Sequence, residues 1–487
     1  MKKQVEAIIS QKLHLNVVLI RIFKYSLQPL ALYLKKCTIM KKNLLYLLLI
    51  SVFIIAAGFV VMKYKKSEAK KETAVYQLLE RRGAQAQTEE WTIIKRAAAK
   101  MTDAIETNPY DKKSLINLAN LMVMEGRATG NYTYYDMAAM KYINNVLSIE
   151  PNNFEALTLK ALVQLSQHHF ADGLATAETA RKINPYNAFV YGILVDGNVE
   201  MGHYDSAVSA ADKMLSIRPD LRSYARASYL REINGDYPGA IEAMKMAVDA
   251  GAAGDESTEW SRVQLAHLYE NIGDLKNAAI QYTFAYNERP GYPYPLAGLA
   301  RMAIAEKDYS KAVAYYQQAD SIVNNSTFKE ELASAYKLAG RNEEAKILLD
   351  AAIKEMATNA KTAITDESIG HYSDKELAEV YTRTGDYERA LEHALAEYNR
   401  RPENIDVNET LAWAYYNKGD VTKAIQYIQV ANKTGSQSPT LLCRTGLIFL
   451  KAGDKVKAKK YLQDGLKNNP NIFAELKNIS TEALKQL

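Results

Sequence analysis

The chain is poor in the residues that build compact metal or disulfide modules. It has two cysteines and twelve prolines in 487 residues, and Cys37 and Cys443 lie far apart without metal-ligand spacing. This argues against a disulfide framework and against a zinc module. A Gly-rich phosphate loop, a GxSxG elbow, an HExxH helix and a CxxC pair are all missing from the sequence. These absences predict a protein that is not an enzyme and binds no cofactor.

The composition is that of a folded, helical chain. Apolar residues make up 48% and charged residues 24%, which argues against bulk disorder. Tyrosine is abundant, with 33 residues, and Val and Ile form no regular alternating runs, so helix is favoured over sheet.

The net charge of +5 divides into two opposite regions. Residues 1–71 carry 14 Lys and Arg against 2 Asp and Glu, whereas the rest holds 47 basic and 54 acidic residues. A mildly acidic main body is not typical of proteins that bind the phosphate backbone of nucleic acids, so we expect no nucleic-acid partner.

The N-terminal part contains one long apolar run. Residues 44–61, LLYLLLISVFIIAAGFVV, carry no charge and would span roughly 27 Å as a helix, close to the thickness of a bilayer core. A buried core helix is usually shorter, and the apolar region of a cleaved signal peptide normally has about 7 to 15 residues. We therefore predict an uncleaved, single-pass membrane helix over residues 43–62.

The orientation of this helix is nearly balanced by the lysines on its two sides. Met40, Lys41 and Lys42 resemble the start of a signal-type segment, which places the N-terminus inside and the main body outside the cytoplasm, in the periplasm. Met40 is then an alternative initiator, and residues 1–42 are a basic segment or a mis-assigned start.

A period of 34 residues runs through most of the chain. Gly-Asp pairs recur at 385–386, 419–420 and 453–454, and related turns occur upstream at 202–207, 235–240, 273–278, 307–312 and 340–345. Each unit reads as two helices. In one of them, Gly273 ends the first helix in a left-handed conformation and Asp274 caps the second. A single hairpin cannot bury its own apolar face, so the units must stack.

This pattern resembles the tetratricopeptide repeat family. The residues that carry the resemblance in one unit are Ala266, Tyr269, Gly273, Ala278, Tyr282, Ala285 and Pro290. The resemblance implies an all-α, right-handed solenoid of about ten helix-turn-helix hairpins, preceded by the membrane helix. We divide the chain into a basic segment (1–42), the membrane helix (43–62), a basic linker (63–77), the repeat array (78–473) and a capping helix (474–487).

Two insertions interrupt the period, at 127–137 and at 360–370, and both are predicted to be loops. His169 and His203 lie 34 residues apart, at equivalent turns of neighbouring units. A metal site at this pair is the less favoured interpretation, because no carboxylate or cysteine stands where it would complete tetrahedral ligation.

The resemblance implies that the first helices of the hairpins line a concave groove. Carrying the family geometry onto this sequence, the groove side chains are Tyr229, Trp260, His267, Tyr294, Arg301, Trp413 and Tyr416. Aromatic residues and arginine are the types that anchor bound peptides. An alternative for each of these residues is packing between helices.

Two functions follow from this organisation. The first is a membrane-anchored, non-enzymatic scaffold that presents its groove to proteins or peptides, in envelope assembly or secretion. The alternative is an extracytoplasmic binding protein for a peptide or glycan, serving an uptake or processing system. The sequence does not indicate the oligomeric state.

Overall fold

The chain divides into two compact units, residues 1–76 and residues 77–487. The computed structural model describes residues 49–59, 62, 76–323, 326–365, 371–468 and 472–487. Residues 49–59 are helical, but among the described helices none has the length and apolar character needed to cross a bilayer. Residues 43–48, 60 and 61 of the predicted membrane helix lie outside the described residues, so this helix stays a prediction.

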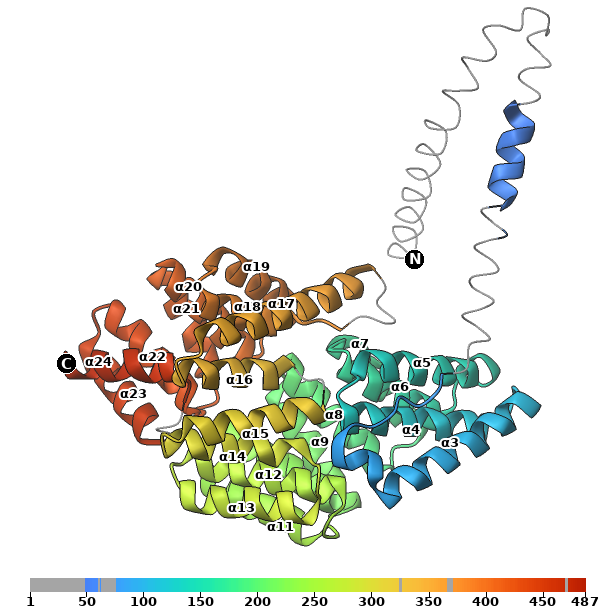
Figure 1. The fold of residues 1–487 in the computed structure, drawn as a ribbon, viewed down its shortest axis with the longest axis horizontal. Helices are drawn as coiled ribbons and strands as arrows, with labels where there is room; N and C mark the ends of the chain where they lie inside the picture. Colours follow the sequence, from blue (N-terminus) through green and yellow to red (C-terminus); the bar gives the residue numbers. More distant parts are fainter. Residues whose placement is uncertain (1–48, 60–61, 63–75, 324–325, 366–370, 469–471) are drawn as a thin grey trace, which may run out of the picture. The chain divides into compact units, whose positions relative to one another are not determined.

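The second unit is built from helical hairpins (Figure 1). Its described residues contain helices and no strand. The first helices of the ten hairpins are α4 (Lys112–Thr129), α6 (Phe154–Ser166), α8 (Ala188–Met201), α10 (Leu221–Ile233), α12 (Glu256–Asn271), α14 (Pro293–Ala305), α16 (Ser326–Leu338), α18 (Asp374–Thr384), α20 (Ile405–Lys418) and α22 (Pro439–Lys451). The second helices are α5 (Tyr132–Ile149), α7 (Phe170–Ile183), α9 (Tyr204–Ile217), α11 (Tyr237–Asp249), α13 (Leu275–Glu288), α15 (Tyr309–Ile322), α17 (Asn342–Thr365), α19 (Tyr387–Arg400), α21 (Val421–Ala431) and α23 (Lys455–Asn468).

Shorter pieces stand at both ends of this array. A 3₁₀ turn, η1 (Gly83–Gln87), and a helix, α3 (Glu89–Thr107), precede the hairpins, and α24 (Ala474–Lys485) follows them. The prediction of an all-α repeat solenoid is confirmed for the described residues.

The fifth hairpin, α12 and α13, shows why the repeat folds this way. Gly273 has φ +78°, which glycine adopts without the steric cost of a Cβ. The Asp274 N–H donates to Tyr269 O (2.9 Å), and the Asp274 carboxylate accepts from the Asn277 N–H (3.1 Å). Ala278 is fully buried between the two helices, and its small side chain lets them approach closely.

The loop prediction for residues 127–137 was wrong. α4 continues to Thr129 and α5 begins at Tyr132, so the extra residues lengthen both helices of the first hairpin instead of forming a loop. The second insertion likewise begins as helix, because α17 extends to Thr365. Residues 366–370 lie outside the described residues.

The array curves with its first helices on the inside. Neighbouring first helices, such as α10 and α12 or α18 and α20, contact each other directly, whereas neighbouring second helices make no comparable contact within the described residues. We call the face of α8 to α22 on the inside of this curve the inner surface.

The curve brings distant hairpins together edge to edge. We call the short turns inside hairpins the turn edge, and the segments that join successive hairpins the loop edge. At the third hairpin, Asn404 Nδ2 donates to Glu200 O (3.0 Å), and the Ile405 N–H donates to Tyr204 Oη (2.9 Å). Arg401 forms an ion pair with Glu200. The turn of the third hairpin thus packs on the segment before the ninth.

The same contact repeats along four consecutive turns. At the second hairpin, the Tyr372 N–H donates to Gln167 O (3.3 Å), and the His168 and His371 rings lie 4.1 Å apart. Burial lowers the pKa of His168 to about 4 and that of His371 to about 3, so both rings are neutral here. At the fourth and fifth hairpins, Gly235 and Gly273 face the backbone at Gly435 and Asn468. Each turn therefore meets the segment that lies six hairpins further along.

The N-terminal segment of this unit also makes contacts between distant parts of the array. Gln85 Nε2 donates to Gly291 O (3.0 Å), and Arg289 pairs with Glu90 (2.8 Å). Arg81 is buried in an ion pair with Glu125 (2.6 Å), which fixes η1 against α4. Residues 81–90 therefore connect the first hairpin to the segment before the sixth.

Two glycines with the same backbone conformation allow the packing of the turn edge on the loop edge to be tested. Gly202 (φ +82°) faces the backbone of Glu403 and Asn404, with Asn404 N 2.7 Å from an added Cβ, whereas Gly385 (φ +83°) has no described atom within 4 Å. Alanine at either position costs roughly 1–2 kcal/mol for the left-handed conformation. Gly202→Ala must also displace the segment before the ninth hairpin, which adds about 1–3 kcal/mol.

We expect a lower thermal unfolding midpoint for Gly202→Ala than for Gly385→Ala. Amide hydrogen exchange at residues 401–405 should accelerate only in Gly202→Ala. Equal midpoints and equal exchange would show that the edges do not pack on each other.

Candidate partner-binding surface

Arg301 of α14 joins three hairpins on the inner surface. Its Nε lies 3.1 Å from Glu270 Oε1 of α12, and its Nη1 lies 3.4 Å from Glu331 Oε1 of α16. Its Nη2 donates to Tyr282 Oη (2.9 Å) and contacts His267 Nε2 (3.0 Å). The predicted site residues His267 and Arg301 are therefore brought together, but both are engaged within the chain.

Burial of this network decides the charge of its members. Burial lowers the pKa of His267 to about 4, and the positive charge of Arg301 acts in the same direction. Burial acts to raise the pKa of Glu270, but Arg301, His267 and the hydrogen bond from Tyr282 together outweigh burial and hold that pKa low. A neutral imidazole thus packs beside a paired guanidinium and carboxylate.

Arg444 of α22 forms a second network of the same kind. Its Nη2 lies 2.6 Å from Glu379 Oε2 of α18, and its Nη1 lies 3.1 Å from Glu409 Oε1 of α20. Its guanidinium also stands over the ring of Trp413, 5.3 Å from the centroid. One arginine therefore again links two carboxylates from neighbouring first helices.

The predicted residues Trp413 and Tyr416 stack on each other. Their ring centroids lie 4.7 Å apart and the planes are nearly parallel, at 8°. Trp413 is only 8% exposed and belongs to the core beneath α22, and Lys451 Nζ lies over the Tyr416 ring at 4.6 Å. The structure thus places Trp413 between helices and leaves Tyr416 partly accessible.

Two further predicted residues are partly buried between hairpins. Trp260 packs on the cores of both the fourth and the fifth hairpins. Tyr294 lies edge-on to Tyr292 (5.1 Å) and Phe328 (5.7 Å). Most of the contact area of both rings is used within the array.

Tyr229 of α10 differs from the other predicted residues because its side chain is substantially accessible. It is 39% exposed, although it lies inside the curve. The negative charges of Asp406, Glu200 and Glu232 act on its hydroxyl. The ordinary pKa of a phenol is about 10, so this hydroxyl is protonated at neutral pH and can donate a hydrogen bond.

The carboxylates near Tyr229 are incompletely neutralised. Burial raises the pKa of Glu232 to about 7, against a hydrogen bond from Asn271 Nδ2 (3.2 Å) that lowers it, and Asp406 raises it further. Burial likewise raises the pKa of Glu409 to about 7 in spite of Arg444. This part of the inner surface is therefore rich in carboxyl groups near their titration point at neutral pH.

Sequence reasoning did not single out Glu379, Glu409, Arg444 or Glu270 as members of these networks. A signal was present, because the paired residues are separated by about one repeat: Arg301 and Glu270 by 31 positions, and Arg444 and Glu409 by 35. Opposite charges on first helices at this separation face each other across neighbouring hairpins.

The two histidines considered for a metal site lie in different environments. His169 is buried and stacks on Tyr372 at 4.5 Å, whereas His203 is exposed. Among the described residues, no group of three or more His, Cys, Asp and Glu is arranged to hold a metal ion.

Comparison with known proteins finds a match for part of the repeat array. A family model described as tetratricopeptide repeat matches residues 375–439. Residues 375–439 are therefore similar to tetratricopeptide repeats. These matched repeats form the eighth and ninth hairpins, which include Glu379, Glu409 and Trp413.

Relatives and solved structures are similar to longer or shorter parts of the chain. Tetratricopeptide repeat protein 21A of Mus musculus is 20% identical over 366 residues, which cover 69% of this chain and 27% of the mouse protein. The chain thus matches about a quarter of that relative. A thermophilic TPR protein of Thermus thermophilus is 20% identical, with 42% of this chain and 98% of that one covered and a TM-score of 0.33. The human IFIT1 dimer with PPP-AAAA is 16% identical, with 72% and 80% covered and a TM-score of 0.44.

The raised pKa of Glu232 predicts a pH-dependent cost to folding. Between pH 4.5, its usual pKa, and pH 7 the folded chain binds more protons at this group than the unfolded chain. Stability therefore falls as the pH rises through this window. Glu232→Gln removes the charge and should raise the free energy of unfolding at pH 8 by about 1–3 kcal/mol.

The stabilisation by Glu232→Gln should vanish below pH 4.5, where the wild-type carboxyl is protonated in both the folded and the unfolded chain. Chemical denaturation at pH 4.5 and pH 8 measures the difference. Glu242→Gln, at an exposed position of α11, is the control and should change stability by less than about 0.5 kcal/mol at either pH. A loss of stability in Glu232→Gln at pH 8 would contradict the assignment.

Proposed function

We propose that this chain is a non-enzymatic, membrane-anchored scaffold whose repeat array binds a protein or peptide segment on its inner surface. Residues 43–62 would anchor it, and the array would lie outside the cytoplasm, in the periplasm. The partner would be held close to the membrane, as envelope assembly or secretion requires.

The observation that carries this proposal is the environment of Tyr229. Its ring lies inside the curve of the array and is 39% exposed, whereas Tyr237 and Tyr282, in the second helices of the fourth and fifth hairpins, are buried. An aromatic ring that water covers in the free protein can contribute contact area when a partner replaces the water.

The charged networks support binding in a different way. Arg301 and Arg444 are each held by two carboxylates from neighbouring hairpins. Charges that are already paired keep the inner surface in one shape, so less conformational freedom is lost when a partner binds. We therefore assign Arg301 and His267 a positioning role and Tyr229 a contact role.

A photo-crosslinking amino acid at position 229 tests this proposal in cells that produce the full chain. We expect discrete adducts with partner proteins at position 229. We expect none at Ile280, which is 38% exposed on the outer helix α13. Tyr229→Ala should weaken retention of the captured protein about ten-fold or more without changing the helical circular dichroism. The same adducts at both positions, or none at 229, would refute a role of the inner surface.

Reporter fusions test the predicted side of the membrane. Alkaline phosphatase fused after Leu487 should be active, because it folds only outside the cytoplasm, and a cytoplasm-restricted fluorescent protein at the same place should stay dark. Fluorescence without phosphatase activity would place the array in the cytoplasm and reverse the predicted orientation.

A further inference from the structure

The contact between the turn edge and the loop edge leaves one stretch of each edge without a covering segment among the described residues. Turns of the second to fifth hairpins are covered by later segments of the chain. The turns of the seventh to tenth hairpins contain Gly340, Gly385, Gly419 and Gly453, and an added Cβ at each would meet no described atom within 4 Å. These four turns form the open turn edge.

The opposite edge is open at the start of the array. The segments before the first four hairpins, residues 108–111, 150–153, 184–187 and 218–220, form the open loop edge. Tyr110 and Tyr186 lie on it and are 73% and 80% exposed. Side chains as apolar and as exposed as these are the kind that protein interfaces cover.

The open loop edge has the same local structure as the covered one. Asn404 caps α20 with its Oδ1, and its Nδ2 donates to Glu200 O across the edge. Asn187 stands at the same place before α8 and caps it with its Oδ1 (2.9 Å to the Phe189 N–H). Its Nδ2 has no partner among the described residues. Pro185 and Pro402 also occupy equivalent positions in these two segments.

The open turn edge has one aromatic side chain of the kind that receives a segment on the covered turns. In the covered turns of the second and third hairpins, the first residue of the second helix is aromatic, and a segment from further along the chain packs on it. Phe170 lies under Arg401 (4.5 Å), and Tyr204 accepts the Ile405 N–H and lies under Lys433 (4.9 Å). Tyr387 is the equivalent residue of the eighth hairpin and is 38% exposed.

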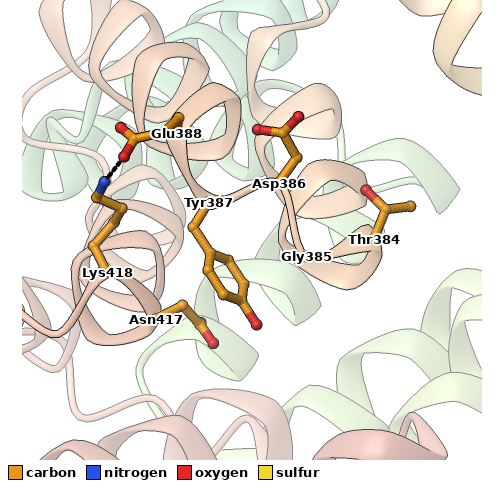
Figure 2. Close-up of a pocket in the computed structure, with 7 residues that line it drawn as sticks. All are labelled: Thr384, Gly385, Asp386, Tyr387, Glu388, Asn417 and Lys418. Atoms are coloured by element: carbon orange, nitrogen blue, oxygen red, sulfur yellow. Dashed lines mark hydrogen bonds and ion pairs between the residues drawn. The ribbon is translucent and has the colours of Figure 1, made fainter.

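Tyr387 borders a hollow on this edge. The hollow is lined by Thr384, Gly385, Asp386, Tyr387, Glu388, Asn417 and Lys418. Figure 2 shows the Tyr387 ring extending between the turn at Gly385 and the end of α20, with the ion pair of Lys418 and Glu388 at one side. A segment such as 184–187 would cover this hollow as residues 401–404 cover the turn of the third hairpin.

We propose that a second copy of this chain docks its open loop edge on the open turn edge, so that the superhelix continues from one copy to the next. The occupant follows from continuity with the contact already made within the chain, which pairs four turns with four segments in order. The two surfaces differ, so the association is head-to-tail and each copy keeps one free edge. The proposal concerns the edges and is independent of what binds the inner surface.

Sedimentation velocity of the full chain in mild detergent, with the detergent contribution matched out, tests this association. The mean mass should rise with concentration above that of the 54.6 kDa chain. Tyr110→Glu with Tyr186→Glu should weaken self-association about ten-fold or more, and Tyr387→Glu should do the same. Ile280→Glu is the control, because Ile280 has the same exposed fraction as Tyr387 but lies on the outer face of α13.

Mixing the two variants separates head-to-tail docking from a two-fold dimer. The loop-edge variant keeps an intact turn edge, and Tyr387→Glu keeps an intact loop edge, so their mixture should form a dimer through the one remaining contact. Circular dichroism confirms that each variant is folded. A wild-type chain that stays monomeric at every concentration, a control as impaired as the variants, or a mixture that stays monomeric would each overturn the proposal.

Discussion

The packing of the turn edge on the loop edge is the contact on which the rest of this array depends. The two helices of a hairpin are held together by small buried residues such as Ala278 and Ala390, but those contacts act within one unit. The edge contact joins residues about 200 positions apart, such as Glu200 and Arg401. The edge contact therefore joins hairpins that are distant in the sequence into one compact unit. Bringing residues so far apart in the sequence together costs conformational entropy.

The charged networks of the inner surface result from the same curvature of the array. Because neighbouring first helices touch, their charged side chains are brought within reach of each other, and arginines become paired with two carboxylates each. The pairs fix the spacing between hairpins, and the carboxyl groups left over, such as Glu232, take raised pKa values. The curvature of the array and the electrostatics of its inner surface therefore have one origin, since a more open curve would separate both the helices and the charges.

The local part of this structure could be predicted from the sequence, and the distant part could not. Gly273, Asp274 and Ala278 act within a few residues of one another, so a 34-residue period was enough to place the hairpins and their caps. The helical ends of α4 and α5 were missed because the packing of Tyr135 and Met122 in the core favours helix where the period alone indicated an insertion. Whether Trp413 or Tyr229 is accessible depends on hairpins elsewhere in the array, and the repeat pattern carries no information on how tightly it curves.

A curved array of this kind leaves an open edge at each end whenever it is longer than one superhelical turn. Chemistry alone does not distinguish the covered turns from the uncovered ones, because Gly202 and Gly385 have the same conformation and are each followed by a tyrosine near the start of the second helix. What differs is whether another described segment of the chain packs on them. The same kind of turn surface therefore occurs twice in the chain, once covered and once open. The segment that packs on the covered turns indicates what kind of segment fits the open turns. The exposed tyrosines at the start of the array stand on such segments, so the shape and chemistry required of a partner at the open turn edge are already encoded in the chain itself.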